Sequence, residues 1–188
     1  FYNKKDNVLT DFSKGIAMYE ITSSGKIVNK KYNTWTEDMR KFLPINDKGK
    51  IDNVGFLYTH KLVQTPNGKI FAVCEGYKRN ANAAGIALTM LAAAGGGYAN
   101  AGMTKMVVTD MVVMEFDPSF KVVNAVIYDK KDNTALAGAT SDYNSQHAIA
   151  FYLKNMGSFD YAFTTADKDY ETFSFCYNDY ERSKDYKG

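Results

Sequence analysis

Apolar and polar positions along the chain fall into short runs that predict β-hairpins. Each predicted hairpin has two runs of strand-forming residues, separated by a turn rich in Gly, Pro, Asn, Asp or Ser. The turn Thr65-Pro66-Asn67-Gly68 has Pro and Gly where such turns favour them. The strands of the four predicted hairpins lie at 16–21 and 26–32, 54–63 and 69–77, 105–116 and 121–129, and 159–165 and 171–178.

Two short helices are predicted between these hairpins. The first covers 37–43, where Thr36 can supply an N-cap and Pro44 stops the helix. The second begins at Asn144 or Ser145 and ends at Gly157. Its apolar residues recur at i, i+3, i+4 and i+7, which is one face of a helix: Ile149, Tyr152, Leu153 and Met156.

The predicted hairpins repeat along the chain. Segment 16–33 matches segment 111–128 without a gap, and 56–74 matches 159–176 when one residue is dropped from the earlier turn. Four-stranded β units in tandem are the blades of a propeller. We therefore predict an all-β fold of propeller-like, four-stranded antiparallel blades with short connecting helices. One whole blade would span 54–129, with half a blade on each side.

A complete eight-stranded β-sandwich or barrel is the alternative, because 188 residues can form one. A propeller needs about four to eight blades to close. On the propeller interpretation, residues 1–188 are a single β domain and a segment of a larger propeller. Cys74 and Cys176 would then occupy equivalent places on successive blades and point in the same sense, which predicts two buried free thiols.

One uncharged run, residues 80–104, interrupts the central blade as an Ala/Gly-rich insert. A helix over Ala83 to Ala94 would rise about 18 Å, too short for the roughly 30 Å core of a bilayer. The run lacks the basic face of an interfacial helix, which disfavours peripheral membrane contact without excluding it. Burial against its own blade and burial against a protein partner remain equally weighted. The candidate partner-interface residues are Ile86, Leu88, Met90, Leu91 and Tyr98.

Composition and motifs narrow the classes of function. Apolar residues make up 45% of the chain, which is enough for a substantial core. The 23 basic and 21 acidic residues are scattered along the chain, so no basic patch indicates nucleic-acid binding. Segment 97–102 begins like a phosphate-binding loop, but Met103 stands where the loop needs Lys. His60 and His147 have no ligand at metal-site spacing, and the acidic turn 167–171 lacks the Gly of a calcium loop. No catalytic, cofactor-binding or metal-binding residue is predicted, and no cofactor.

Two segments on either side of the insert resemble a family of uncharacterised proteins from Bacteroidota. They are 56–77 (FLYTHKLVQTPNGKIFAVCEGY) and 105–124 (KMVVTDMVVMEFDPSFKVVN). The resemblance implies a propeller-like fold of unknown function in a periplasmic, outer-membrane-associated or secreted protein. It carries over no catalytic residues. The chain itself starts at Phe1 without a secretory signal, so targeting does not indicate a compartment.

Together these observations favour a non-enzymatic scaffold or protein-interaction module of the bacterial cell envelope. Its insert would meet a protein partner or the remainder of its own longer chain. The alternative is part of a propeller hydrolase or lyase whose site is completed by residues outside this chain. Whether the protein is an enzyme stays open, with a preference for a non-enzyme.

Overall fold

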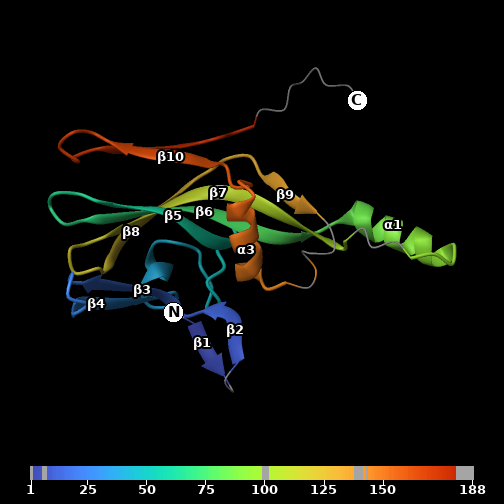
Figure 1. Cartoon of the computed structure of the whole chain (residues 1–188), viewed down its shortest axis with the longest axis horizontal. Helices are drawn as coiled ribbons and strands as arrows, with labels where there is room; N and C mark the ends of the chain where they lie inside the picture. The colour runs from blue at the N-terminus through green and yellow to red at the C-terminus, as the bar shows by residue number, and fades with distance from the viewer. Residues whose placement is uncertain (1, 6–7, 99–101, 138–141, 143, 181–188) are drawn as a thin grey trace.

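A computed structural model of the chain describes residues 2–5, 8–98, 102–137, 142 and 144–180. An antiparallel sheet of five strands forms its centre (Figure 1). Its strands are β5 (Phe56–Gln64), β6 (Ile70–Ala81), β7 (Thr104–Phe116), β8 (Val122–Tyr128) and β9 (Asn133–Ala137). Strands β5 to β8 follow one another as a meander. Strand β9 pairs with the first half of β7, and β8 pairs with the second half of the same edge.

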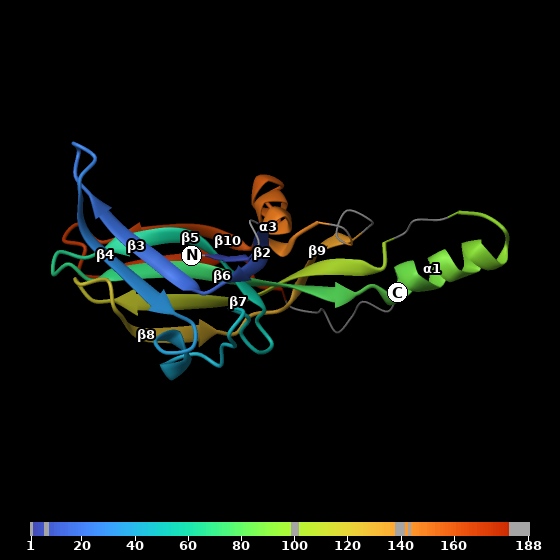
Figure 2. The same ribbon diagram turned by 90° about the horizontal axis from the view of Figure 1, so that it is seen from below.

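The described residues also form three two-stranded hairpins. Two of these hairpins cover the central sheet, one on each face. The β3–β4 hairpin covers one face and the β10–β11 hairpin the other (Figures 1 and 2). The strands of the hairpins are β1 (Tyr2–Lys5) and β2 (Val8–Ser13), β3 (Gly15–Ile21) and β4 (Ile27–Thr34), and β10 (Tyr161–Ala166) and β11 (Phe173–Tyr177).

The sheet face under β3–β4 carries the larger apolar core. Side chains at alternate positions of β6 and β7 point to it, among them Ala72, Met114 and Phe116, because successive residues of a strand face opposite sides. Ile16 and Met18 of β3 pack against this core. The segment between β4 and β5 closes it with Trp35, Met39, Leu43, Ile45, Ile51 and Val54.

The opposite face is shared by the helix α3 (Gln146–Asn155) and the β10–β11 hairpin. Ile149 and Leu153 of α3 are fully buried against the end of the sheet that holds Met106. Farther along the same face, Phe173 of β11 contacts the ring of Phe71, with ring centroids 4.9 Å apart. The central sheet is therefore the middle of three layers.

The predicted all-β, antiparallel fold is confirmed, and so is the second helix. Ser145 caps α3 by accepting a hydrogen bond from the Ala148 amide at 3.2 Å, and Gly157 follows with a positive φ of 65°. Strands β1, β2 and β9 were not predicted. The described strands close neither a barrel nor a ring of blades.

The helix predicted over 37–43 is wrong, because only a single 3-10 turn forms there, η1 (Met39–Lys41). The Asp38 carboxylate accepts hydrogen bonds from the amide and hydroxyl of Thr34, which holds the preceding chain in a turn. A helix of seven residues is too short to be stable without tertiary support. Here the burial of Met39 and Leu43 in the core decides the local conformation.

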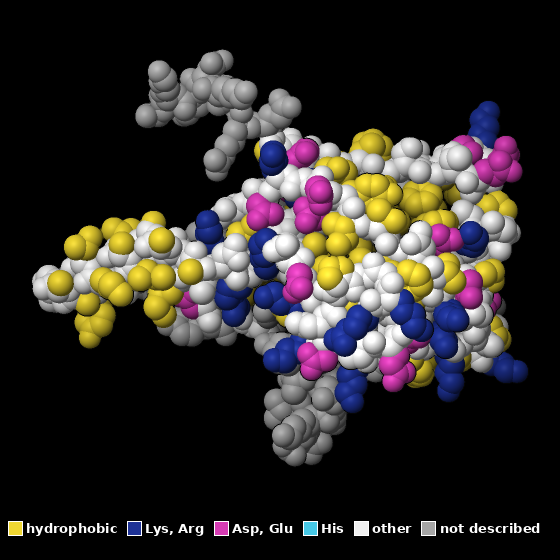
Figure 3. Space-filling view, turned by 180° about the vertical axis from the view of Figure 1, so that it is seen from behind, with side chains coloured by type: hydrophobic (Ala, Val, Ile, Leu, Met, Phe, Trp, Pro, Cys, Tyr) yellow, Lys and Arg dark blue, Asp and Glu magenta, His cyan; other side chains and the backbone are white. Residues whose placement is uncertain are grey.

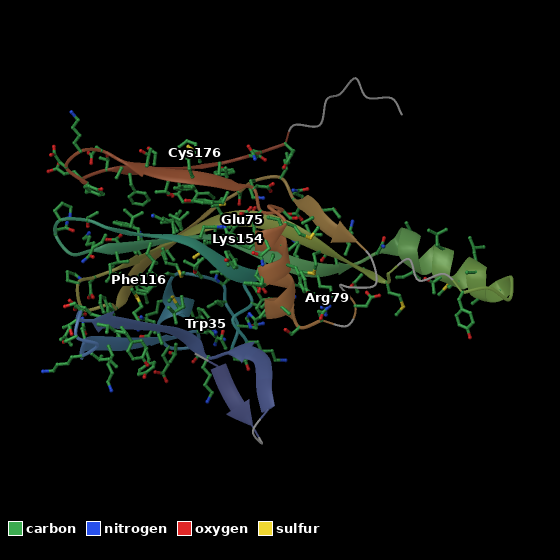
Figure 4. The ribbon with its side chains drawn as sticks, in the orientation of Figure 1. Trp35, Glu75, Arg79, Phe116, Lys154 and Cys176 are labelled. Carbon is green, nitrogen blue, oxygen red and sulfur yellow. The ribbon has the colours of Figure 1, made fainter. Side chains whose placement is uncertain are left out.

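Both cysteines are free, as predicted, but their placement differs from the prediction. Cys74 points into the core under β3–β4 and is fully buried. Cys176 is only half-buried. Its neighbours on the strand, Phe175 and Tyr177, stack on each other, and Phe175 also contacts Tyr128 of the central sheet. These two rings therefore face the sheet, and Cys176, which lies between them in the sequence, faces the other way. Cys176 therefore lies on the outer side of β10–β11 (Figure 4), and the two thiols point in opposite senses.

Candidate functional site

The insert 80–104 forms a projecting arm, which we call the α1 arm. Strands β6 and β7 stay paired as far as Ala81 and Thr104, and the helix α1 (Ala83–Ala94) follows at the bounds considered from the sequence. Asn82 closes the base of the arm, since its backbone N–H donates a hydrogen bond to the Met103 carbonyl at 2.8 Å. The helix extends away from the body, beyond the end of the sheet (Figures 1 and 2).

The apolar side chains of the α1 arm are exposed. Leu88, Met90 and Leu91 keep 54%, 67% and 69% of their surface exposed, and Tyr98 is fully exposed. Of the five candidate interface residues, Ile86 alone is half-buried. On the face that a space-filling view shows, apolar side chains cover the arm, and Lys, Arg, Asp and Glu lie on the body (Figure 3). The body does not cover this helix, which counts against the interpretation of self-burial.

Polar contacts tie the base of the arm to the segment before α3. The Asp142 carboxylate accepts hydrogen bonds from the amides of Met103 and Thr104 at 2.9 and 2.8 Å, and from the Thr104 hydroxyl at 2.6 Å. The Thr104 hydroxyl, ahead of the other bonds, holds the pKa of Asp142 below its usual range. Arg79, near the arm's root (Figure 4), donates to the Asn144 carbonyl at 2.7 Å. The arm therefore has an anchored base and an uncovered helix.

A second feature, a buried charged cluster, joins four segments on the α3 side of the sheet. Its members are His60 of β5, Glu75 of β6, Lys130 after β8 and Asp160 before β10, and Figure 4 shows Glu75 inside the body. The Lys130 ammonium lies 2.6 Å from Asp160 Oδ2 and 3.3 Å from Glu75 Oε1. The Glu75 carboxylate also accepts the amides of Asp160 and Tyr161, each at 3.1 Å.

His60 is the member of the charged cluster whose buried side-chain nitrogens make no hydrogen bond to a described residue. Its side chain is fully buried, stacked on Tyr161 with ring centroids 4.5 Å apart and in edge contact with Phe159. Nε2 lies 3.0 Å from Glu75 Oε2, but neither ring nitrogen makes a hydrogen bond with a described residue. Aromatic packing, more than hydrogen bonding, therefore holds this ring.

The charged cluster is placed to hold the fold together, because burial leaves a substrate almost no access to it. The side chains of His60, Glu75 and Lys130 have no exposed surface, and that of Asp160 keeps 3%. Two further groups donate hydrogen bonds to the Asp160 carboxylate, Asn133 Nδ2 at 3.0 Å and the Tyr180 hydroxyl at 2.9 Å. That bond to Asp160 raises the pKa of Tyr180 above its ordinary value. Groups of three or more His, Cys, Asp or Glu that could hold a metal ion are absent from the described residues.

Sequence reasoning missed the charged cluster, although one signal was present. Glu75 is the only charge in the apolar run from Ile70 to Tyr77, and a single charge between apolar neighbours on a central strand needs a buried partner. The identity of that partner was not readable, because Lys130 and Asp160 come from loops far away in the chain. His60 was considered only as a metal ligand.

A third feature is an apolar groove between the edge strands β3 and β5, which we call the β3–β5 groove. It consists of two adjoining hollows of about 440 and 390 Å³ that share Ile16, Ala17 and Thr59. Leu57 lines one hollow and Leu62 the other. Among the described residues, the lining of both hollows contains no Lys, Arg, Asp or Glu, and His147 of α3 is its one titratable imidazole.

Comparison with known proteins gives a family but no function. Neither a curated protein nor a solved structure matches the chain. A family model described as a family of unknown function, DUF6770, matches residues 1–188, the whole sequence. The chain with this projecting apolar arm and buried charged cluster therefore belongs to the DUF6770 family.

Proposed function

We propose that this protein is a non-enzymatic protein-interaction module and that the α1 arm carries its interface. The observation that supports this is the exposure of Leu88, Met90 and Leu91, each more than half accessible, on a helix that projects from the body. A helix that is apolar on all sides is stable in water only at a cost, which a covering surface removes. Contiguous exposed apolar surface of this kind marks interaction sites.

A protein surface fits the arm better than a lipid bilayer. Within the described part of the chain, no helix combines the length and apolar character needed to cross a membrane. The chain leaves α1 at Gly95 and runs through Tyr98 without helical structure before it returns to β7. In hydrocarbon, every backbone group of such a segment needs an internal partner, whereas a protein partner can supply hydrogen bonds.

The propeller-like arrangement and the cell-envelope location belong to the same proposal. The meander β5–β8 lies between two hairpins, one on each face, as a blade lies between its neighbours. The outer side of β3–β4 carries exposed apolar residues, including Ile21, Val28 and Tyr32, which a further layer could cover. The resemblance noted in the sequence supports a periplasmic, outer-membrane-associated or secreted protein.

Replacing the arm tests the proposed interface. Residues 83–102 are exchanged for Asn-Gly, a two-residue turn that suits the antiparallel pair Asn82 and Met103. A second variant, Leu88→Glu with Leu91→Glu, keeps the arm and adds charge. We expect both variants to fold with the circular dichroism of a β protein and to lose the complex that the wild-type chain forms in cross-linking and pull-down experiments. A control, Met156→Lys, changes a residue of the body that is 64% exposed and should keep the complex. Complexes unchanged in both arm variants would refute the proposal.

A further inference from the structure

We propose that the α1 arm of one copy of this chain docks in the β3–β5 groove of a second copy. The inference rests on the proposed function, which makes the arm a protein interface, and adds the identity of the partner and the surface that receives the arm. Three observations carry it: the chemistry of the groove, the matching chemistry of the arm, and their separation on the molecule.

The groove is open to an apolar occupant. It lies between strands that each have one edge without a strand partner among the described residues, since β3 pairs with β4 and β5 with β6. Its hollows reach down to side chains of the large core, including Met114 and Phe116. Hollows of about 440 and 390 Å³ lie in the size range of ligand-binding sites, which is about 300–1,000 Å³.

The arm and the groove match in charge. The arm has no charged residue from 80 to 104. The described lining of the groove has no Lys, Arg, Asp or Glu, and its His147 is uncharged when the imidazole is neutral. Elsewhere the body presents Lys, Arg, Asp and Glu over much of its surface (Figure 3). Covering an unpaired charge with an apolar helix is costly. The groove is therefore a surface of this chain that can receive the arm without burying a charge.

The arm of a chain does not fill that chain's own groove. It points away from the body beyond the end of the sheet (Figure 2), and none of the described residues in 80–98 and 102–104 lines either hollow. Arm and groove are different surfaces, so their contact between copies is heterologous. A helix of 12 residues is about 18 Å long and 10–12 Å wide, which is small beside the roughly 800 Å² per partner of a stable interface. We therefore expect association that rises with protein concentration.

Complementation between two variants tests this arrangement. Leu88→Glu spoils the arm but leaves the groove, and Leu62→Lys spoils the groove but leaves the arm; both residues are more than half exposed, so neither change disturbs the core. In sedimentation velocity over a concentration series, the wild-type chain should self-associate and each variant alone should stay monomeric. An equimolar mixture should form a complex of two chains, because one intact arm meets one intact groove. Met156→Lys, which is exposed and outside both hollows, should associate like the wild type.

The outcomes separate this inference from the proposed function. A wild-type chain that stays monomeric throughout the series overturns the inference. A wild-type chain that associates while the mixture of variants does not also overturns it, because the arms would then meet each other. If, in either case, the arm variants still lose a different protein partner in the pull-down, the proposed function stands without this inference. If arm replacement changes nothing in any assay, both fail.

Discussion

Methionine is buried in the central sheet and exposed on the α1 arm, and this comparison separates the two regions. Met106, Met111 and Met114 of β7 have no exposed surface, whereas Met90 of α1 is 67% exposed. In the sheet, apolar side chains stabilise the fold by leaving water. On the arm, similar side chains remain in water and add little to stability. The fold of the body explains its own apolar sequence, whereas the exposed apolar residues of the arm find their explanation only in the proposed interface.

Substitutions in the charged cluster should lower the free energy of unfolding of the body more than the other substitutions proposed here. Lys130→Met leaves the carboxylates of Glu75 and Asp160 buried without their cation. Removal of one partner from a buried ion pair costs about 3–5 kcal/mol. We expect a loss of that size in the free energy of unfolding, measured by urea denaturation. Lys69→Met is the matched control, because Lys69 pairs with Glu115 at 2.7 Å on the surface and should cost at most about 1 kcal/mol. Equal losses would show that the buried cluster is not special.

The methionines give a direct test of the comparison. Met114→Ala opens a cavity in the core and should cost about 2–5 kcal/mol. Met90→Ala makes the same chemical change on the arm, where no core is lost and Ala favours the helix. It should alter stability by no more than about 0.5 kcal/mol. Thermal unfolding of both variants beside the wild type measures the difference, and a large loss from Met90→Ala would mean that the arm is part of the core.

How far the sequence predicted these two regions depends on the range of the interactions. Turn residues and alternation are local, so the hairpins and the bounds of α1 could be predicted from the chain alone. Burial of Glu75 depends on Lys130 and Asp160, which only the folded chain brings near. The exposure of Leu91 was equally unreadable, because a local pattern does not say what lies against a helix. The same limit explains Cys176, whose side of the hairpin follows from the packing of Phe175 on Tyr128.

Cys74 makes the stability of the body depend on pH. Burial raises the pKa of the Cys74 thiol to about 12, although the Thr59 hydroxyl at 3.3 Å lowers it in part. The unfolded thiol ionises at about 8.5, so this contribution is complete below that pH and is lost as the pH rises towards 12. Between these values, stability should fall by about 1.4 kcal/mol per pH unit because of this one group.

Urea denaturation from pH 8 to 10.5 measures that slope. Cys74→Ala should show a slope shallower than that of the wild type by this amount. Val73→Ala, a buried change on the same strand without a thiol, should shift the curve but keep the wild-type slope. Parallel curves for the wild type and Cys74→Ala would contradict the assignment.

The smallest expected effect lies at the junction between arm and body. Asp142→Ala removes the acceptor of the Met103 amide, so hydrogen exchange at that amide should become faster while global unfolding stays the same. The pKa of Asp142 is held below its usual range, so in the wild type the bond is present above the usual Asp value of about 3.9 and is lost as the pH falls through the lower folded value. Exchange at Met103 in the variant should lack this acid dependence. If Asp142→Ala instead lowered the global stability as much as Met114→Ala, the base of the arm would belong to the cooperative body, and the boundary between the two regions would lie farther out, at α1 itself.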